Sequence, residues 1–294
     1  MRAVQTLWTS PFAAANSGRS FAGFLSYEDF LMTWALSASL LRRWFPELVL
    51  YTDNEGAAAA RHLQLPYDQI FVTLDRQTAS PLLWNLPKLL TYRAENAPFL
   101  HVDLDFLMWK PIAPELLAAP ILAQRPETRM EEQQFYRLTL RALNRILPQL
   151  PPLWRTGSVD ELARSSINCG VFGGFEIDLI HRYAAENIAV LTDPQNLAAL
   201  AALPSGGVQK PWHYIVTVEQ IGLSQALAAS NRLPTFLNVE AVDECEQYLH
   251  LVAFRKQDQT LMTIIRDALR RDSAEIYARI PQAVNAFAAL RGVS

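Results

Sequence analysis

Cysteine is scarce in this chain, which has only Cys169 and Cys245 among its 294 residues. Small secreted domains are usually held together by several disulfides. Two cysteines so far apart in the sequence do not form such a framework. We therefore expect reduced thiols and a cytoplasmic protein.

The chain also lacks an excess of charge of either sign. It has 26 Lys and Arg residues against 29 Asp and Glu residues, a formal net charge of -3. Such a balance provides no general attraction to nucleic acid, which we exclude as a partner. An anionic substrate must therefore be bound by a few local cations or by a metal ion.

Long hydrophobic runs are missing as well. The most apolar stretch, 30–45, is interrupted by polar and basic residues, and no run reaches the roughly 18 apolar residues of a membrane span. Residues 1–17 have polar side chains where a signal peptide has its hydrophobic centre. We expect no transmembrane segment, although the C-terminal helices leave peripheral contact with the inner face of the membrane open.

Several well-known sequence motifs are absent. The chain has no Gly-x-Gly-x-x-Gly, no phosphate-binding loop ending in Lys-Ser or Lys-Thr, no Cys-x-x-Cys and no Gly-x-Ser-x-Gly. These motifs are typical of dinucleotide-binding enzymes, P-loop enzymes, redox or zinc sites, and α/β-hydrolases. The sequence therefore favours none of these classes.

What the chain does have is the alternation of an α/β protein. Strand-like apolar runs at 3–9, 48–51 and 99–104 alternate with helical patterns at 27–44 and 56–63. This order predicts a mostly parallel sheet flanked by helices. Ligands bind such sheets beyond the carboxyl ends of the strands.

Two further segments complete the expected organisation. Residues 125–166 are rich in Arg, Glu and Gln with leucines at helical spacing, which indicates a helical insertion. Helical patterns also cover 260–271 and 274–290. We expect one α/β domain over 1–256 and a C-terminal helical extension over 257–294.

The clearest candidate site is Asp103-Leu104-Asp105, at the end of the apolar strand that starts at Phe99. Alternation along a strand places Asp103 and Asp105 on the same side. Two like charges so placed are stabilised by a cation, and carboxylate oxygens suit Mn²⁺ or Mg²⁺. The alternative is that the two aspartates only cap a turn.

Other motifs follow in a recognisable order. They are Trp84–Leu90 with Lys88, Pro98–Asp105, Ser166–Phe172 with Asn168 and Gly170, and His250–Lys256. Together they resemble GT-A glycosyltransferases, especially retaining families 8 and 32. Val4–Thr9 and Leu48–Asp53 also resemble a group of uncharacterised bacterial GT-A-like proteins. In the last motif Ala253 stands where family 8 has glycine, and the family's Pro-Trp after Lys256 is absent.

The resemblance implies a GT-A fold, the nucleotide-diphospho-sugar transferase fold, with a Rossmann-like mixed central sheet. It also implies a metal ion, Mn²⁺ or Mg²⁺, on Asp103, Asp105 and His250. Residues at Glu219 and Gln220 would act at the reacting sugar carbon. The implied donor-binding residues are Trp8, Thr9, Asp53, Lys88, His101, Asp103, Leu104, Asn168, Gly170 and Lys256.

Each of these residues has a structural alternative. Trp8 and His250 could be core residues, Asn168 could belong to a turn, and Lys256 could be a solvated surface lysine. Glu219 could be an exposed residue at the start of a helix. His101 could either contact the donor, orient a carboxylate or only pack.

The expected function is transfer of a sugar, with retention, from a nucleoside diphosphate sugar such as a UDP-sugar to a saccharide or glycolipid acceptor. Assembly of a bacterial surface polysaccharide would fit this activity. One alternative is a nucleotide-sugar or glycan-binding protein without turnover. The other is a sugar nucleotidyltransferase, although the segment 13–23 has little of that class's glycine-rich basic loop.

Overall fold

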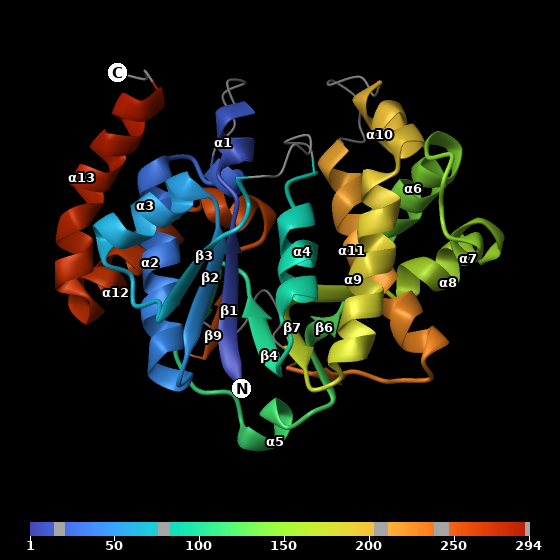
Figure 1. Ribbon diagram of the computed structural model, residues 1–294, viewed down its shortest axis with the longest axis horizontal. Helices are drawn as coiled ribbons and strands as arrows, with labels where there is room; N and C mark the ends of the chain where they lie inside the picture. Colours follow the sequence, from blue (N-terminus) through green and yellow to red (C-terminus); the bar gives the residue numbers. More distant parts are fainter. Residues whose placement is uncertain (15–20, 76–82, 203–210, 238–246, 292–294) are drawn as a thin grey trace. The chain divides into compact units, whose positions relative to one another are not determined.

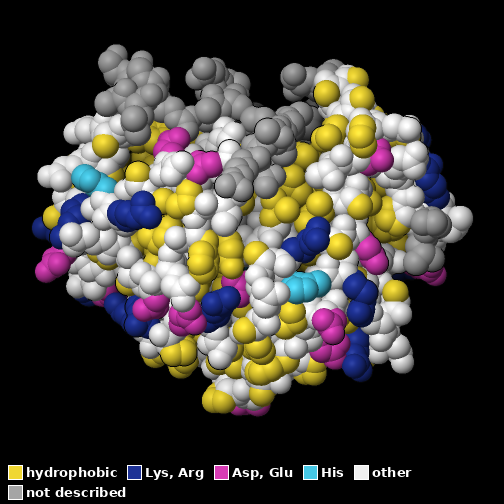
Figure 2. All heavy atoms as spheres, viewed as in Figure 1, with side chains coloured by type: hydrophobic (Ala, Val, Ile, Leu, Met, Phe, Trp, Pro, Cys, Tyr) yellow, Lys and Arg dark blue, Asp and Glu magenta, His cyan; other side chains and the backbone are white. Residues whose placement is uncertain are grey.

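The computed structural model describes residues 1–14, 21–75, 83–202, 211–237 and 247–291. The fold is α/β, as predicted. Seven strands form a mostly parallel sheet in the order β3-β2-β1-β4-β7-β6-β8, and a second sheet pairs β5 with β9. Within the described residues, none of the helices is long and apolar enough to cross a membrane. Basic and acidic side chains are interspersed on the face drawn in Figure 2.

The chain divides into two compact units. Unit 1 comprises Met1–Gln77, His101–Ile112 and Val239–Ser294, and unit 2 comprises Thr78–Leu100 and Ala113–Asn238. The expected helical insertion at 125–166 lies in unit 2. The expected C-terminal extension lies in unit 1, together with the first three strands.

Unit 1 contains the parallel strands β1 to β3 and the helices that cover them (Figure 1). Helices α12 and α13 pack against α2. The elements are β1 (Arg2–Leu7), α1 (Ser10–Ala14), η1 (Phe21–Gly23), α2 (Tyr27–Trp44), β2 (Leu48–Thr52), α3 (Asn54–Leu63), β3 (Gln69–Val72), the end of β4 (Phe99–Val102), β5 (Phe106–Met108), β9 (Tyr248–His250), η3 (Ala253–Gln257), α12 (Gln259–Asp272) and α13 (Ala274–Arg291).

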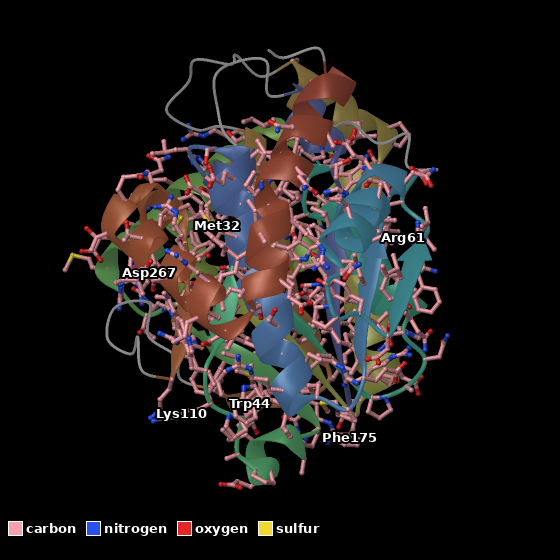
Figure 3. The ribbon with its side chains drawn as sticks, turned by 90° about the vertical axis from the view of Figure 1, so that its left-hand side faces the viewer. Met32, Trp44, Arg61, Lys110, Phe175 and Asp267 are labelled. Carbon is pink, nitrogen blue, oxygen red and sulfur yellow. The ribbon has the colours of Figure 1, made fainter. Side chains whose placement is uncertain are left out.

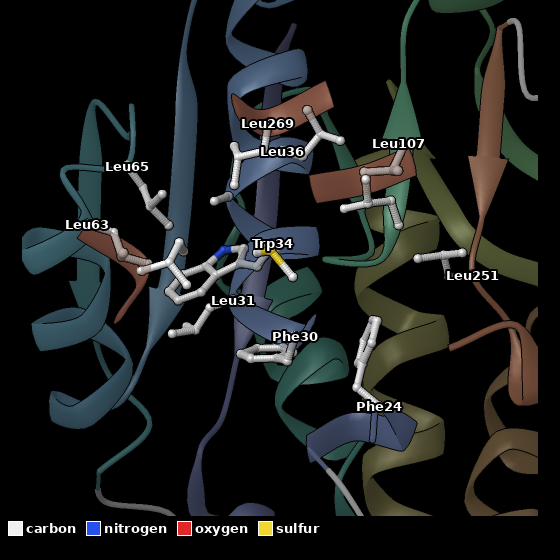
Figure 4. Close-up of a cluster of buried hydrophobic side chains, with 14 of the residues drawn as sticks. Phe24, Phe30, Leu31, Trp34, Leu36, Leu63, Leu65, Leu107, Leu251 and Leu269 are labelled. Carbon is white, nitrogen blue, oxygen red and sulfur yellow. The ribbon is translucent and has the colours of Figure 1, made fainter. Parts of the chain in front are cut away.

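Helix α2 is the central helix of unit 1, and its sequence explains both its ends and its burial. The Ser26 hydroxyl accepts a hydrogen bond from the Asp29 backbone N–H and caps the first turn. Acidic residues lie in the first turn and Arg42 and Arg43 in the last, which suits the helix dipole. Figure 4 shows the apolar cluster around this helix, where Trp34 lies near Leu31 and Leu63. Figure 3 labels Met32 on the same helix.

Unit 2 is built on the antiparallel pair β6–β7, with β8 parallel to β6. Helices α4, α9 and α11 pack side by side (Figure 1). The elements are α4 (Leu86–Ala94), the start of β4, α5 (Pro114–Leu117), β6 (Ile121–Pro126), α6 (Met130–Ile146), α7 (Pro152–Thr156), α8 (Val159–Arg164), β7 (Ile167–Gly174), α9 (Ile177–Thr192), α10 (Pro194–Ala201), α11 (Pro211–Ala229) and β8 (Thr235–Phe236).

Two expectations about strand length are wrong. The strand expected over 99–104 ends at Val102, and the Phe106 N–H bonds to the Asp103 carbonyl, 3.0 Å away, in a turn. The two aspartates therefore lie in this turn and not on one side of a strand. Their charges do not suit a buried strand, whereas a turn lets both carboxylates reach polar partners. The apolar run 248–254 also predicts a strand, but this strand ends at His250.

Gly173 provides a test of how closely the strands of unit 2 approach. A Cβ at this position would lie 2.1 Å from the backbone oxygen of Phe99, which cannot move without shifting β4. We predict that Gly173→Ala destabilises the protein by about 1–3 kcal/mol, measured by urea unfolding. The control is Gly222→Ala in α11. Its Cβ would meet only the Asn187 side chain, and alanine favours a helix by roughly 1 kcal/mol. Equal losses in the two variants would contradict this account.

Candidate functional site

The turn after β4 brings three possible metal ligands together in unit 1. Strand β9 pairs antiparallel with β5, so that His250 lies opposite Phe106. The Leu251 N–H also bonds to the Asp105 carbonyl at 3.0 Å. His250 Nε2 lies 3.4 Å from Asp105 Oδ1 and 3.9 Å from Asp103 Oδ2. One ligand atom of each of the three residues lies within 4.8 Å of the others.

Lys256 extends this group. Its Nζ lies 2.6 Å from Asp105 Oδ2 and donates to the Ala22 carbonyl oxygen at 2.7 Å. The same ammonium lies 5.4 Å from the centre of the Phe24 ring, within the range of a cation–π contact. Lys256 is therefore not a solvated surface lysine, and it connects η1 to the carboxylate turn.

The backbone of η3 has an unusual conformation at the residue that departs from the family 8 motif. Ala253, which stands at the glycine position of that motif, has φ 50, in the left-handed region. Glycine adopts this conformation readily, whereas an L side chain pays a steric cost. The chain thus keeps the local geometry that a glycine favours, although it has alanine.

The ionisation of Asp105 follows from its neighbours. Burial works to raise the pKa of Asp105, but the Lys256 ammonium and the hydrogen bond from His250 outweigh burial and hold this pKa well below its usual range. Asp105 is therefore a carboxylate at neutral pH. An ionised carboxylate is the form that binds a metal ion.

Buried polar side chains hold the turn from the side of the core. Gln5 Nε2 donates to Ser37 Oγ at 3.0 Å and to the Asp103 carbonyl at 3.5 Å. The Ser37 hydroxyl in turn donates to the Phe106 carbonyl at 2.8 Å, and Tyr67 donates to Gln5 Oε1 at 2.6 Å. Backbone groups at both ends of the turn are thus fixed by side chains of β1 and α2.

His101 lies beside the same turn. Its Nε2 is 3.1 Å from the Thr6 hydroxyl, and its Nδ1 is 3.7 Å from Asp103 Oδ1. His101 is almost completely buried. The position suits a residue that orients the Asp103 carboxylate, and donor contact stays a prediction. Leu104, also expected at the donor, packs its side chain against the core of unit 1.

The residues expected at the nucleotide lie where β1 and β2 end. Trp8 is buried directly after β1. The Thr9 N–H and hydroxyl donate to Asp53 Oδ2 at 2.7 and 2.8 Å, while Asp53 Oδ1 accepts from the Gly56 N–H at 2.9 Å and caps α3. Asp53 thus has a structural role at the start of a helix. Contact between these residues and a nucleotide stays a prediction.

In unit 2 the expected residues form a second polar group. Lys88 Nζ donates to the Cys169 carbonyl at 2.8 Å and lies 3.1 Å from Glu219 Oε1. The Asn85 amide donates to the other oxygen of Glu219. Glu219 is not at the start of a helix, because α11 begins at Pro211, and its side chain is buried. Gln220, which accepts from the Tyr136 hydroxyl, is buried as well.

Asn168 and Gly170 lie in β7 and not in a turn. Asn168 Oδ1 accepts from the Gly170 N–H at 2.9 Å, and its amide donates to Glu127 Oε1 at 2.6 Å. Cys169, between them, is buried, and its thiol donates to the Ile167 carbonyl at 3.4 Å. Cys245 lies outside the described residues.

The expected site residues thus lie in three places: at the turn after β4 and at the ends of β1 and β2 in unit 1, and around β7 and α11 in unit 2. Sequence reasoning missed several partners, because Arg125, Glu127 and Glu132 look like ordinary charges of a solvated helix. The available signal was that Arg125 and Glu127 come within four residues of the end of the apolar run Ile121–Ala123. For Asn85 and Tyr136, the neighbouring sequence gives no indication of which residues they contact.

The three-ligand group in unit 1 could hold a divalent metal ion. Two carboxylates and one imidazole provide oxygen and nitrogen ligands, which Mn²⁺ accepts, and carboxylates alone suit Mg²⁺. Asp103 and Asp105 are partly exposed and His250 is buried, so a ligand can reach the carboxylates.

Comparison with known proteins adds a family without a known activity. No curated protein matches this sequence. Residues 1–283 match a family described as a family of unknown function, DUF6734. The match covers nearly the whole chain, so the protein belongs to the DUF6734 family.

Proposed function

We propose that this protein is a metal-dependent glycosyltransferase that uses a nucleoside diphosphate sugar, with a UDP-sugar as the first candidate. One observation carries the proposal: Asp103, Asp105 and His250 converge in unit 1, with Lys256 on the same carboxylate. Three potential ligands and a cation from the middle and the end of the chain are arranged as a diphosphate-metal site requires. The resemblance to GT-A families 8 and 32 supports the same activity.

The site has the charges that departure of a diphosphate needs. A divalent cation held by Asp103, Asp105 and His250 would neutralise the negative charge that grows on the leaving oxygen. Lys256 already lies against Asp105, 2.6 Å away. If a cation were bound by Asp105, the Lys256 ammonium would be available to a phosphate oxygen.

The resemblance gives the residues of unit 2 their roles in this proposal. It implies that Lys88, Asn168 and Gly170 bind the donor. Glu219 and Gln220 would act at the reacting sugar carbon, as a base or as stabilisers of an oxocarbenium-like transition state. The side chains of Glu219 and Gln220 are buried and hydrogen-bonded. Such groups keep one geometry, which supports a specific role for each residue.

Turnover separates this function from its alternatives. We expect the purified protein to release UDP from at least one member of a panel of UDP-sugars when Mn²⁺ and a mixture of saccharide acceptors are present. Calorimetry with UDP, with and without Mn²⁺, measures binding in parallel. Metal-dependent binding with no UDP release from any donor would favour a binding protein. Release of pyrophosphate from UTP and a sugar phosphate would favour a nucleotidyltransferase.

The metal site predicts a loss of Mn²⁺ affinity in Asp105→Asn. The amide is isosteric but carries no negative charge, so we expect the affinity to fall at least about tenfold, roughly 1.4 kcal/mol, in a titration followed by electron paramagnetic resonance. The matched control is Asp267→Asn on α12, whose exposed side chain is labelled in Figure 3. Equal Mn²⁺ affinity in the two variants would refute the site.

Lys256 predicts two opposite effects. In Lys256→Met the cation that competes for Asp105 is gone, so Mn²⁺ alone should bind roughly threefold more tightly, as expected for a partly exposed ion pair. Binding of UDP in the presence of Mn²⁺ should weaken, because one phosphate contact is lost. Lys110→Met, at an exposed lysine, is the control (Figure 3). Weaker binding of Mn²⁺ alone would show that Lys256 does not compete with the metal.

A further inference from the structure

A cluster of charges in unit 2 has no place in the proposed reaction. Arg125, on β6, contacts two carboxylates from the segment that follows it. Its Nη1 donates to Glu132 Oε2 at 3.1 Å, and its Nη2 lies 3.5 Å from Glu127 Oε2 and also contacts Glu132. Arg125 and Glu127 are each 5% exposed. One guanidinium thus faces two carboxyl groups in a site with little water.

A proton resolves this imbalance of charge. Burial raises the pKa of Glu127 to about 7, the neighbouring Glu132 adds to this rise, and Arg125 opposes it. Burial also works to raise the pKa of Glu132, but hydrogen bonds from Arg125 and Glu127 outweigh burial and lower it. Glu127 is therefore the carboxyl group that holds the proton, and Glu132 is the carboxylate that accepts it.

Two neighbours favour the ionised form of Glu127: the Arg125 guanidinium and the Asn168 amide, whose hydrogen bond also lowers the pKa of Glu127. Tyr136, on α6, has a pKa raised well above its ordinary value by burial, with Glu127 and Glu219 adding to the effect, and it stays a neutral phenol. On β7 the neighbour is the neutral Asn168 amide. Arg125 is thus the cation that faces Glu127 among the groups that affect its ionisation.

The cluster is coupled directly to an irregular part of β7. Ala123 pairs with Phe172, but Arg125 pairs with Asn168, so two steps along β6 correspond to four along β7. Such bulges redirect side chains and are common beside functional sites. Glu127 accepts from the Asn168 amide, while Asn168 Oδ1 accepts from Gly170.

Lys88 is held by the same irregular segment. The Cys169 carbonyl, between Asn168 and Gly170, accepts from Lys88 Nζ at 2.8 Å, and Lys88 also pairs with Glu219. The Glu127 carboxyl group is therefore two hydrogen-bonded steps along β7 from Lys88. Glu127 and Lys88 thus bind neighbouring residues of β7, Glu127 at the Asn168 amide and Lys88 at the Cys169 carbonyl.

We propose that Glu127 is a positioning residue, which fixes the Asn168 amide and the segment Asn168–Gly170 for binding of the nucleoside diphosphate donor. The assignment of the donor rests on the proposed function, whereas the coupling of Glu127 to Asn168 does not. Loss of the proton places a second negative charge beside Glu132 and weakens the cluster. Donor binding should therefore decrease as pH rises through neutrality.

The first test is stability against pH in Glu127→Gln. The folded-state pKa of Glu127 is raised above its unfolded value, so its contribution to stability is present at acid pH and is lost as pH rises through about 7. Glutamine mimics the protonated acid and does not titrate. Between pH 5 and pH 8 we expect the Tm of the parent protein to fall relative to that of Glu127→Gln by about 5 °C.

A matched variant tests the partner in the pair. In Glu132→Gln the repulsion on Glu127 is gone, so the fall in Tm relative to Glu127→Gln should become smaller and move to lower pH. If the Tm values of the parent and Glu127→Gln change in parallel from pH 5 to pH 8, Glu127 does not hold the proton. If the pH profile of Tm is unchanged in Glu132→Gln, Glu127 does not share its proton with Glu132.

The second test is donor binding, measured by calorimetry with UDP and Mn²⁺ at pH 6 and pH 8. Glu127→Ala removes the acceptor of the Asn168 amide and should weaken binding about tenfold at both pH values, a cost near that of one buried, unpaired donor. Glu127→Gln should restore parental affinity at pH 6 and keep it at pH 8, where the parent weakens.

The outcomes separate the two proposals. If Glu127→Ala binds UDP as tightly as the parent, or if Glu127→Gln fails to restore binding, the positioning role is wrong. If Glu127→Ala does not fold, the comparison of the parent with Glu127→Gln at the two pH values decides alone. If the parent does not bind UDP at either pH, the proposed function fails, while the Tm comparison still tests the proton.

Discussion

Repulsion between negative charges is the constraint on which the candidate site depends. Asp103 and Asp105 lie in one turn, and unit 1 surrounds them with partners that reduce this repulsion: Lys256 and His250 at the carboxylates, and buried hydrogen bonds at the backbone. The pairing of β5 with β9 is what brings the end of the chain to this turn. Without that pairing, Asp105 would have neither His250 nor Lys256 beside it.

Unit 2 meets a similar problem by another physical route. There, the buried carboxyl groups of Glu127 and Glu219 and the partly buried Glu132 are stabilised by one guanidinium, one ammonium and one shared proton. The two solutions differ in what an external ligand can change. A metal ion can replace Lys256 at the partly exposed carboxylates of unit 1, whereas Glu127 is buried and responds to pH.

Local patterns predicted much of this fold. The span of α2 was predicted from its spacing of apolar residues and the proline after it, and the alternation of strands and helices predicted the α/β class. The resemblance predicted His250 beside Asp103 and Asp105, whereas Lys256 was expected at the diphosphate and its contact with Asp105 was not predicted. A turn at Asp103 was the alternative to the longer strand, which was favoured because apolar alternation continues through Leu104 into β5. The Arg125 cluster was missed because its partners join three separate elements, which no local pattern records.

The left-handed backbone of Ala253 has a consequence for how η3 folds. Glycine at this position would remove the steric cost but would give the unfolded segment many more backbone conformations. Alanine restricts those conformations, so less entropy is lost when η3 folds into the geometry that places Lys256 on Asp105. A small steric cost at one residue of the folded chain is therefore offset in the unfolded chain.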